Sequence, residues 1–255
     1  MNKIIKYILI DILKGKIVLT YTAFLLAISI SIFLMDDNPS KSTVSLLNIN
    51  LIIIPLVSII FTTIHYYNSY EFIELLVSQP ISRTKIVLSE YIGVTLSLSI
   101  SFIIGVGIPV LLFNRSLSGL SITYSGIMIT IIFSSLAFLC SVMTRDKARG
   151  IGAAILVWLL FSIIYDGLIL ILLFSFIDYP IEPVIMALTH LNPVDLARIF
   201  MLIQLDASAM MGYTGALYLE YFGSIKGTII SSLVMLLWAV LPVYFAVKVF
   251  LKKDL

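Results

Sequence analysis

Long apolar runs dominate this chain, and short polar segments separate them. A helix needs about 20 residues to cross the hydrocarbon core of a bilayer. Runs of about that length occur near residues 17–35, 44–64, 91–113, 120–143, 150–177 and 228–250. Hydrophobic and polar positions do not alternate along these runs, as they would in the strands of a membrane barrel. The pattern therefore predicts an all-α, polytopic membrane protein with six transmembrane helices.

The composition agrees with this prediction. Of the 255 residues, 60% are hydrophobic and 12% are charged, and the mean hydropathy is +1.12. A soluble domain usually carries about 25% charged residues, so a water-soluble fold is excluded. The formal net charge is only +2 and no basic patch stands out, so we expect no nucleic-acid partner.

The distribution of lysine and arginine predicts the orientation in the membrane, because these residues stay on the cytoplasmic side of a crossing. One side collects Lys3, Lys6, Lys14, Lys16, Arg83, Lys85, Arg145, Lys147, Arg149, Lys248, Lys252 and Lys253. The other side has Lys41, Arg115, Arg198 and Lys226 among a larger number of acidic residues. We therefore expect a bacterial inner-membrane protein with both termini in the cytoplasm. The first run is longer than the core of a signal peptide and is interpreted as a retained span.

Two cytoplasmic segments carry basic residues beside helical signals. Isoleucines recur at helical spacing in residues 1–16, with lysines on the opposite side, which predicts a short helix lying in the membrane interface. A frayed basic leader that serves only topology is the alternative. In the turn TRDKARG, Arg145, Lys147 and Arg149 are interpreted as a positive-inside anchor that could also contact lipid phosphates or a partner, and we expect Gly150 to break the helix.

Residues 65–91 are too polar to span the membrane and too apolar for an unstructured loop. We expect a short amphipathic helix that ends at Pro80, since proline disfavours helical geometry at Gln79. Ser82 can then cap a second helix that leads into the third span. Such an elbow can dock on a cytoplasmic partner, or it can be a plain ordered connector. The candidate contact residues are Glu71, Phe72, Glu74, Leu75, Gln79, Pro80 and Arg83.

The segment of residues 178–227 on the opposite side is too long for a structureless loop. Asn192 and Pro193 have the residue types of a helix start, with asparagine as the cap and proline at the first helical position. We expect re-entrant or interfacial helices here, which could line an exit route or form a docking surface. The candidate residues are Asn192, Pro193, Asp195, Arg198 and Tyr213.

Asp166 is an ionisable residue inside a predicted span. A carboxylate at that depth is costly, so it should face the bundle interior and be hydrogen-bonded or protonated. Two interpretations stay open. Asp166 is either a structural group bonded to neighbouring tyrosine or serine side chains, or part of a substrate or coupling path.

Catalytic chemistry finds little support in the sequence. No phosphate-binding loop of the form G-x-x-x-x-G-K-[ST] is present, so energy from ATP has to come from another chain. Neither the H-E-x-x-H zinc pattern nor a G-x-S-x-G run occurs. We therefore expect no catalytic residue, resident metal site or cofactor. His190, Met201, Met210 and Met211 could contact soft copper(I), although methionine in an apolar helix usually serves packing.

Several segments together resemble a known family. They are SYEFIELLVSQPISRTKIVLSEYIG (residues 69–93), SVMTRDKARGIGAAILVWLLFSIIYDGLIL (141–170), LNPVDLARIFMLIQLDASAMMGYTGALYLEYFG (191–223) and KVFLKKDL (248–255). The chain resembles the ABC-2 type permeases over nearly its whole length. The second and third segments are most similar to the branch that serves maturation of nitrous oxide reductase. Ser89-Glu90 departs from the family, since many relatives have Gly-Lys there.

The resemblance implies a single permease domain over residues 1–255 that works as a homodimer with two copies of a cytoplasmic ABC ATPase. Residues 71–83 would rest on that ATPase. In the nitrous oxide branch, a periplasmic beta-helix protein and a copper chaperone would be further partners, and the complex would support assembly of a copper-sulfur centre. Passage of a copper or sulfur species and mechanical actuation both stay open. The alternatives are an ABC-2 exporter of lipid, drug or glycan and a membrane scaffold that transports nothing.

Overall fold

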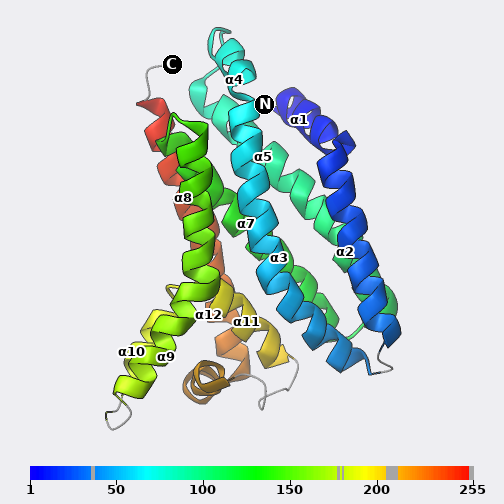
Figure 1. The fold of residues 1–255 in the computed structure, drawn as a ribbon, viewed down its shortest axis with the longest axis vertical. Helices are drawn as coiled ribbons and strands as arrows, with labels where there is room; N and C mark the ends of the chain where they lie inside the picture. The colour runs from blue at the N-terminus through cyan, green and yellow to red at the C-terminus, as the bar shows by residue number, and fades with distance from the viewer. Residues whose placement is uncertain (36–37, 177–178, 180, 205–211, 253–255) are drawn as a thin grey trace.

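The computed structural model describes residues 1–35, 38–176, 179, 181–204 and 212–252 (Figure 1). Every regular element within these residues is helical, so the all-α prediction is confirmed. The helices are α1 (Asn2–Lys14), α2 (Lys16–Met35), α3 (Pro39–Asn68), α4 (Tyr70–Val77), α5 (Arg83–Phe102), α6 (Ile108–Phe113), α7 (Leu117–Met143), α8 (Lys147–Leu159), α9 (Tyr165–Ser175), α10 (Glu182–Thr189), α11 (Pro193–Gln204) and α12 (Gly212–Leu251). Two π-helical turns join α5 to α6 (Ile103–Gly107) and α8 to α9 (Leu160–Ile164).

Six helical stretches within the described residues are long and apolar enough to cross a membrane. They are Lys16–Met35, Lys41–Asn68, Arg83–Phe113, Leu117–Met143, Lys147–Ser175 and Ile225–Leu251. Each one overlaps a predicted span. The third begins at Arg83 rather than near residue 91, because its first turns stay helical and bury Ile86 and Val87 against the bundle.

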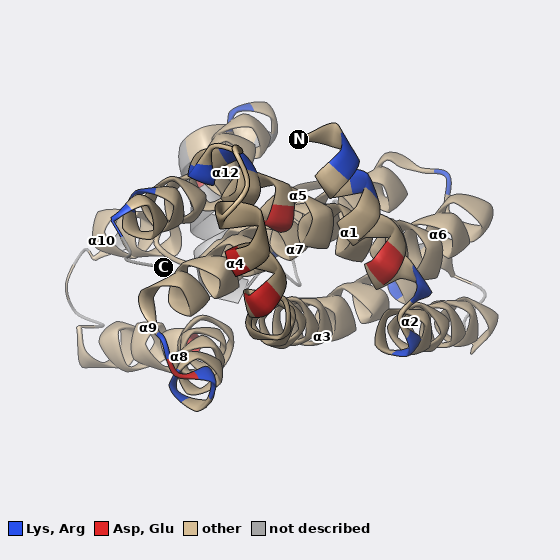
Figure 2. Ribbon diagram, turned by 90° about the horizontal axis from the view of Figure 1, so that it is seen from above, with Lys and Arg blue, Asp and Glu red and all other residues tan. Residues whose placement is uncertain are grey.

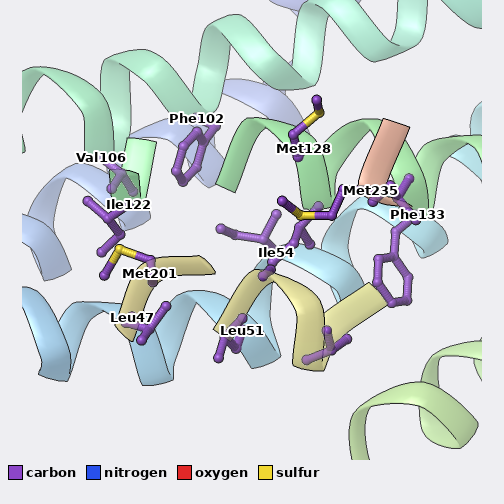
Figure 3. Packing of buried hydrophobic residues seen from close by; sticks show 14 of the residues in the cluster. Leu47, Leu51, Ile54, Phe102, Val106, Ile122, Met128, Phe133, Met201 and Met235 are labelled. Atoms are coloured by element: carbon purple, nitrogen blue, oxygen red, sulfur yellow. The ribbon is translucent and has the colours of Figure 1, made fainter. Parts of the chain in front are cut away.

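Helix α7 lies at the centre of the bundle and packs against α3, α5, α11 and α12. Apolar side chains from these helices interdigitate around it (Figure 3), among them Leu51, Phe102, Met128 and Met235. The ring of Phe102 lies directly over Gly126, where an added Cβ atom would come within 2.1 Å of the ring. The close approach of α5 and α7 therefore depends on this glycine.

The bundle has two distinct ends (Figure 1). The start of α1, helix α4, the turn between α7 and α8 and the last described turns of α12 lie at one of them, here called the α4 end. Helix α11 lies toward the other, here called the α11 end. An even number of spans brings the two terminal regions to the same side, as the sequence predicts.

In the fifth span, α8 packs against α3 and α7, whereas α9 diverges from the bundle (Figure 1). Only 6% of the most apolar stretch of this span is buried, against 72% for the central span Leu117–Met143. Large apolar side chains such as Leu156, Ile163 and Ile171 are exposed along it. The α9 half of this span packs little against other helices, so the polar contacts near it contribute more to its position.

Helices α10 and α11 follow the fifth span and form a bent pair, with an angle of 104° between them. Ten of the twelve residues of α11 are buried, since this helix turns back into the bundle and packs against α12 and α7. Helix α12 then bends at Gly223, whose φ of 68° is a left-handed conformation that glycine adopts at low cost. The prediction of short helices in this segment is confirmed, and their bent arrangement is that of a re-entrant loop or a broken span.

Candidate functional site

Helix α4 presents an exposed acidic face at its end of the bundle. Its inner face buries Ile73, which is 2% exposed, in a cluster with Tyr66, Ile86 and Phe138. Its outer face exposes Glu71, Glu74 and Leu75. A single residue, Ser69, separates α4 from α3, so the helix is attached closely to a membrane span.

The elbow after α4 has the predicted form. Helix α4 ends at Val77 and α5 begins at Arg83, with Pro80 in the turn between them. Gln79 and Pro80 are exposed. Ser82 occupies the cap position of α5, although its side chain makes no capping hydrogen bond. Residues of α4 and of the elbow therefore form one continuous exposed surface.

Two of the candidate contact residues lie elsewhere. Phe72 is half-buried, and its ring lies 5.7 Å from the ring of Tyr7 on α1. Arg83 is half-buried at the start of α5. These two side chains belong to the support of the exposed surface rather than to its outer face. The exposed surface, hereafter the α4 surface, consists of Glu71, Glu74, Leu75, Gln79 and Pro80.

Helix α1 packs beside the α4 surface. Its Ile8 lies against Gly93 of α5, where an added Cβ atom would come within 2.6 Å of the isoleucine side chain. Lys3, Lys6 and Lys14 are exposed on its other side. The amphipathic helix predicted for residues 1–16 is thus confirmed, and a frayed leader does not describe this segment.

The turn between α7 and α8 is joined to the end of α3 by hydrogen bonds. The Tyr67 hydroxyl and Thr144 Oγ1 lie 2.5 Å apart, and Lys147 Nζ donates to Asn68 Oδ1 at 2.9 Å. Asp146 caps α8, since its Oδ1 accepts from the Arg149 backbone N–H at 2.8 Å. The α4 surface is therefore connected through α3 to the start of the fifth span.

The prediction that Gly150 breaks the helix is wrong. Gly150 lies inside α8, and an added Cβ atom would come within 2.0 Å of the Tyr67 hydroxyl. The glycine is needed because the tyrosine packs directly on the helix backbone. Figure 2 looks onto this end and shows acidic positions on α4, with basic positions on α1 and at the start of α8 to either side.

A buried pair that the sequence did not reveal lies just below this surface. Glu90 of α5 is 1% exposed, and its Oε1 lies 3.0 Å from Nε2 of His65 on α3. Ser69 Oγ lies 3.2 Å from the same histidine nitrogen. Glu90 lies in the polar segment predicted for residues 65–91, but helix α5 begins at Arg83 and carries it into the bundle.

At the α11 end, Asn192 organises the start of α11. Its Oδ1 accepts from the Val194 backbone N–H at 3.0 Å, which confirms the predicted cap. Its Nδ2 donates to the Phe161 carbonyl oxygen at 3.1 Å and to Asp195 Oδ2 at 2.9 Å. Phe161 belongs to the π-helical turn of the fifth span. Asn192 thus caps α11 and joins it to that span.

Arg198 extends this network to α9. Its guanidinium donates to Asp195 Oδ1 at 3.0 Å and to Asp166 Oδ2 at 3.2 Å. The side chains of Arg198 and Asp166 are 34% and 37% exposed, whereas that of Asp195 is 6% exposed. Asp166 is ion-paired, as a carboxylate at membrane depth requires. The expected tyrosine or serine partners were wrong, since the partner is an arginine from the re-entrant pair.

Backbone carbonyl groups complete the connections of the re-entrant pair. The Tyr165 hydroxyl donates to the Leu188 carbonyl oxygen at 2.6 Å, and Trp238 Nε1 of α12 donates to the His190 carbonyl oxygen at 3.1 Å. The arrangement brings Asp166, Asn192, Asp195 and Arg198 into one network.

The two remaining candidate residues lie outside this network. Pro193 is buried at the first position of α11, and the side chain of Tyr213 is outside the part of the chain that the structure describes.

The described part of the structure gives no support to a copper site formed by the candidate methionines and His190. Met201 is completely buried in the apolar core (Figure 3), which confirms its packing role. Met210 and Met211 lie outside the described residues. A nitrogen of the His190 ring lies 2.7 Å from the Met186 carbonyl oxygen. Within the described part of the chain, no group of three or more histidine, cysteine, aspartate and glutamate side chains is placed to hold a metal ion.

The greater part of the chain matches a known protein family. Residues 52–255 match the family described as ABC-2 family transporter protein. The chain belongs to the ABC-2 transporter family. "Probable ABC transporter permease protein NosY" of Stutzerimonas stutzeri is 26% identical over 145 residues. This match covers 52% of the chain and 52% of the relative, so the chain spans about half the length of that protein.

Family membership fixes the general role. An ABC-2 permease is the membrane-spanning subunit of a transporter whose ATPase is a separate subunit. This chain is therefore a multi-pass membrane protein of the ABC-2 transporter family.

Proposed function

We propose that this chain transmits ATP-driven movement of two ATPase subunits, bound at the α4 surface, to the re-entrant pair at the opposite end of a permease homodimer. The observation that carries this proposal is the amphipathic helix α4, which exposes Glu71, Glu74 and Leu75 while its inner face is packed on the bundle. An exposed, firmly supported helix suits a surface that receives force from a partner.

The orientation that we propose places the α4 end in the cytoplasm of a bacterium and the α11 end outside its inner membrane. Basic residues support it, because lysine and arginine near membrane crossings stay cytoplasmic. At the α4 end they include Lys3, Lys14, Lys147 and Arg149, all of them exposed. The ATPase is cytoplasmic in this arrangement and meets the α4 surface directly.

A route for the movement runs through the fifth span. Force on α4 reaches α3 across Ser69, and the Tyr67 and Lys147 hydrogen bonds join the end of α3 to the start of α8. Helices α8 and α9 continue to Asp166, which is paired with Arg198 of α11. A shift of this span would therefore move the re-entrant pair.

The weak packing of the fifth span supports a permease homodimer. Its apolar side chains are exposed on the single chain, and a second copy would cover part of them. We expect two permease chains and two ATPase subunits in the complex.

We propose that the transporter serves the maturation of nitrous oxide reductase. Support comes from the resemblance of residues 141–170 and 191–223 to that branch and from the partial match to the Stutzerimonas permease. The complex would then work with a periplasmic beta-helix protein and a copper chaperone in assembling a copper-sulfur centre. Export of lipid, drug or glycan is the alternative from the same family, and a scaffold without transport is the alternative from another class.

Charge reversal on α4 tests the coupling proposal. Glu71→Lys and Glu74→Lys should each weaken ATPase binding by about tenfold, corresponding to about 1.4 kcal/mol, and lower the permease-dependent ATPase activity. Glu220→Lys is the matched control, since Glu220 is an exposed glutamate outside the α4 surface. Unchanged binding and activity in both α4 variants would contradict the assignment of this surface.

Genetic complementation tests the proposed role in maturation of nitrous oxide reductase. A nitrous-oxide-reducing host without its own maturation permease should regain copper-loaded nitrous oxide reductase when it receives this chain with its ATPase. Binding of the ATPase without any recovery of the copper centre would favour the exporter alternative. Absence of any ATPase in the purified complex would favour the scaffold.

A further inference from the structure

An open groove at the α4 end has the dimensions and charges of a phospholipid site. It has a volume of about 380 Å³ and lies between the α1–α2 junction and α3. Its walls are almost entirely apolar, with Ile12, Ile17 and Val18 on one side and Val57, Ile60 and Ile64 on the other. The end of α1, the start of α2 and one face of α3 thus line an open hydrophobic groove.

The groove exists because the chain turns at Gly15. The backbone there is extended (ψ 132°), and the Gly15 N–H donates to the Ile12 carbonyl oxygen at 2.9 Å. Helix α1 therefore leaves the axis of α2 and packs on α5, with Ile8 against Gly93. The face of α3 that includes Ile60 and Ile64 is left half-buried.

The length of the groove matches one leaflet. From Leu56 to Asn68, α3 rises about 18 Å at 1.5 Å per residue. Half of a hydrocarbon core of roughly 30 Å is about 15 Å. An acyl chain that enters at the apolar end would bring its headgroup to the level of Asn68 and Lys16, where the groove becomes polar.

The polar mouth carries one charge of each sign. Lys16 and Asp11 both line it, and among the described residues neither belongs to an ion pair. His65 also lines the mouth, and its Nε2 lies 3.0 Å from Glu90 Oε1 and 3.2 Å from Ser69 Oγ. A lysine attracts a lipid phosphate, and a carboxylate attracts an ammonium group. Both charges together fit a zwitterionic aminophospholipid better than an anionic lipid.

We infer that the groove binds one phospholipid with an amine headgroup, its phosphate at Lys16, its ammonium at Asp11 and an acyl chain along α3. The lipid belongs to the leaflet at the α4 end, which is the cytoplasmic leaflet in the proposed orientation. Since α1 and α3 form the two walls, the bound lipid helps to hold α1 in place beside α4.

Native mass spectrometry of the full chain tests this site, with phosphatidylethanolamine and phosphatidylglycerol as probes. After excess lipid has been removed, we expect each chain to keep one bound phosphatidylethanolamine in preference to phosphatidylglycerol. Lys16→Gln should weaken retention by about fivefold, and Asp11→Asn should remove the preference for the amine lipid. Ile60→Trp should fill the groove and abolish retention. Ile52→Trp is the control, because Ile52 is an exposed residue of α3 outside the groove.

Three results would overturn the inference. Equal retention of the two lipids by the unaltered chain would show that Asp11 does not select an amine headgroup. Equal lipid retention in Ile60→Trp and Ile52→Trp would place the lipid elsewhere. A change of oligomeric state in Ile60→Trp with lipid retention unchanged would make the groove a contact between two copies of the chain. Lys16→Gln keeps the test decisive if Ile60→Trp fails to fold.

Discussion

The guanidinium of Arg198 lies 3.2 Å from the carboxylate of Asp166, so an ion pair joins α11 to α9. This contact matters because α9 packs little against other helices within the described residues. Arg198 also holds Asp195 at 3.0 Å, and Asp195 accepts from Asn192. The re-entrant pair and the fifth span are thus linked by directional contacts between polar groups rather than by a broad apolar interface.

Asp166→Asn should be tolerated better than Asp166→Leu. Asparagine keeps an oxygen that can accept from Arg198, whereas leucine leaves the arginine with Asp195 alone. We expect the leucine variant to lose about 1–3 kcal/mol of stability, measured as thermal unfolding of the purified protein in detergent. Equal loss of activity in both variants, with assembly intact, would instead assign a charge-dependent role to Asp166.

Asn192→Ala should lower the free energy of unfolding by about 2 kcal/mol, because it removes the helix cap and the side-chain hydrogen bond to the part-buried Phe161 carbonyl oxygen. Asn192→Asp should be at least as harmful, although aspartate is a good cap, because it places a second carboxylate beside Asp195. Exchange of the two residues in Asn192→Asp/Asp195→Asn should recover part of the loss. A stable Asn192→Asp single variant would contradict the network.

His65→Ala should be destabilising, by about 1–3 kcal/mol, because it removes the polar group that lies 3.0 Å from the buried Glu90 carboxyl. Replacing both residues in His65→Ala/Glu90→Leu should cost less than the single change, since the buried carboxyl group is then removed as well. Thermal unfolding of the two variants measures the difference. A double variant less stable than His65→Ala would show that the pair is not the source of the effect.

Gly150→Ala should destabilise the junction of α3 and α8 by about 1–3 kcal/mol, because the new methyl group would overlap the Tyr67 side chain. Combining it with Tyr67→Ala should cost less than the sum of the two single changes, since the clash is then removed. Gly152→Ala is the control, because nothing lies within 4 Å of the Cβ atom added there. Equal destabilisation by the two glycine substitutions would contradict the packing of Tyr67 on α8.

Local sequence patterns were enough to predict several elements. The length of each apolar run predicts a span, Pro80 and Ser82 predict the elbow after α4, and Asn192-Pro193 predicts the start of α11. In each case the physical cause lies within a few residues of the signal. Periodicity or backbone chemistry in a short segment is then sufficient.

Contacts between distant segments could not be predicted in this way. Arg198 was expected among the outer charges, and it meets Asp166 only because α11 turns back into the bundle at 104° to α10. Glu90 was expected in the polar segment of residues 65–91, and His65, which lies 3.0 Å from it, comes from a different helix. Gly150 looked like a helix breaker because nothing near it in the sequence indicates that Tyr67 packs on it. Each of these outcomes depends on which helix faces which.

Site-specific photo-crosslinking in membranes tests the coupling proposal most directly. A benzophenone amino acid replaces Leu75, which is 66% exposed on the α4 surface, or, as the matched control, Leu191, which is 56% exposed at the turn between α10 and α11. We predict a crosslink between the ATPase and position 75 on irradiation, and none from position 191. A crosslink to the ATPase from position 191, or none from position 75 in an intact complex, would contradict the account.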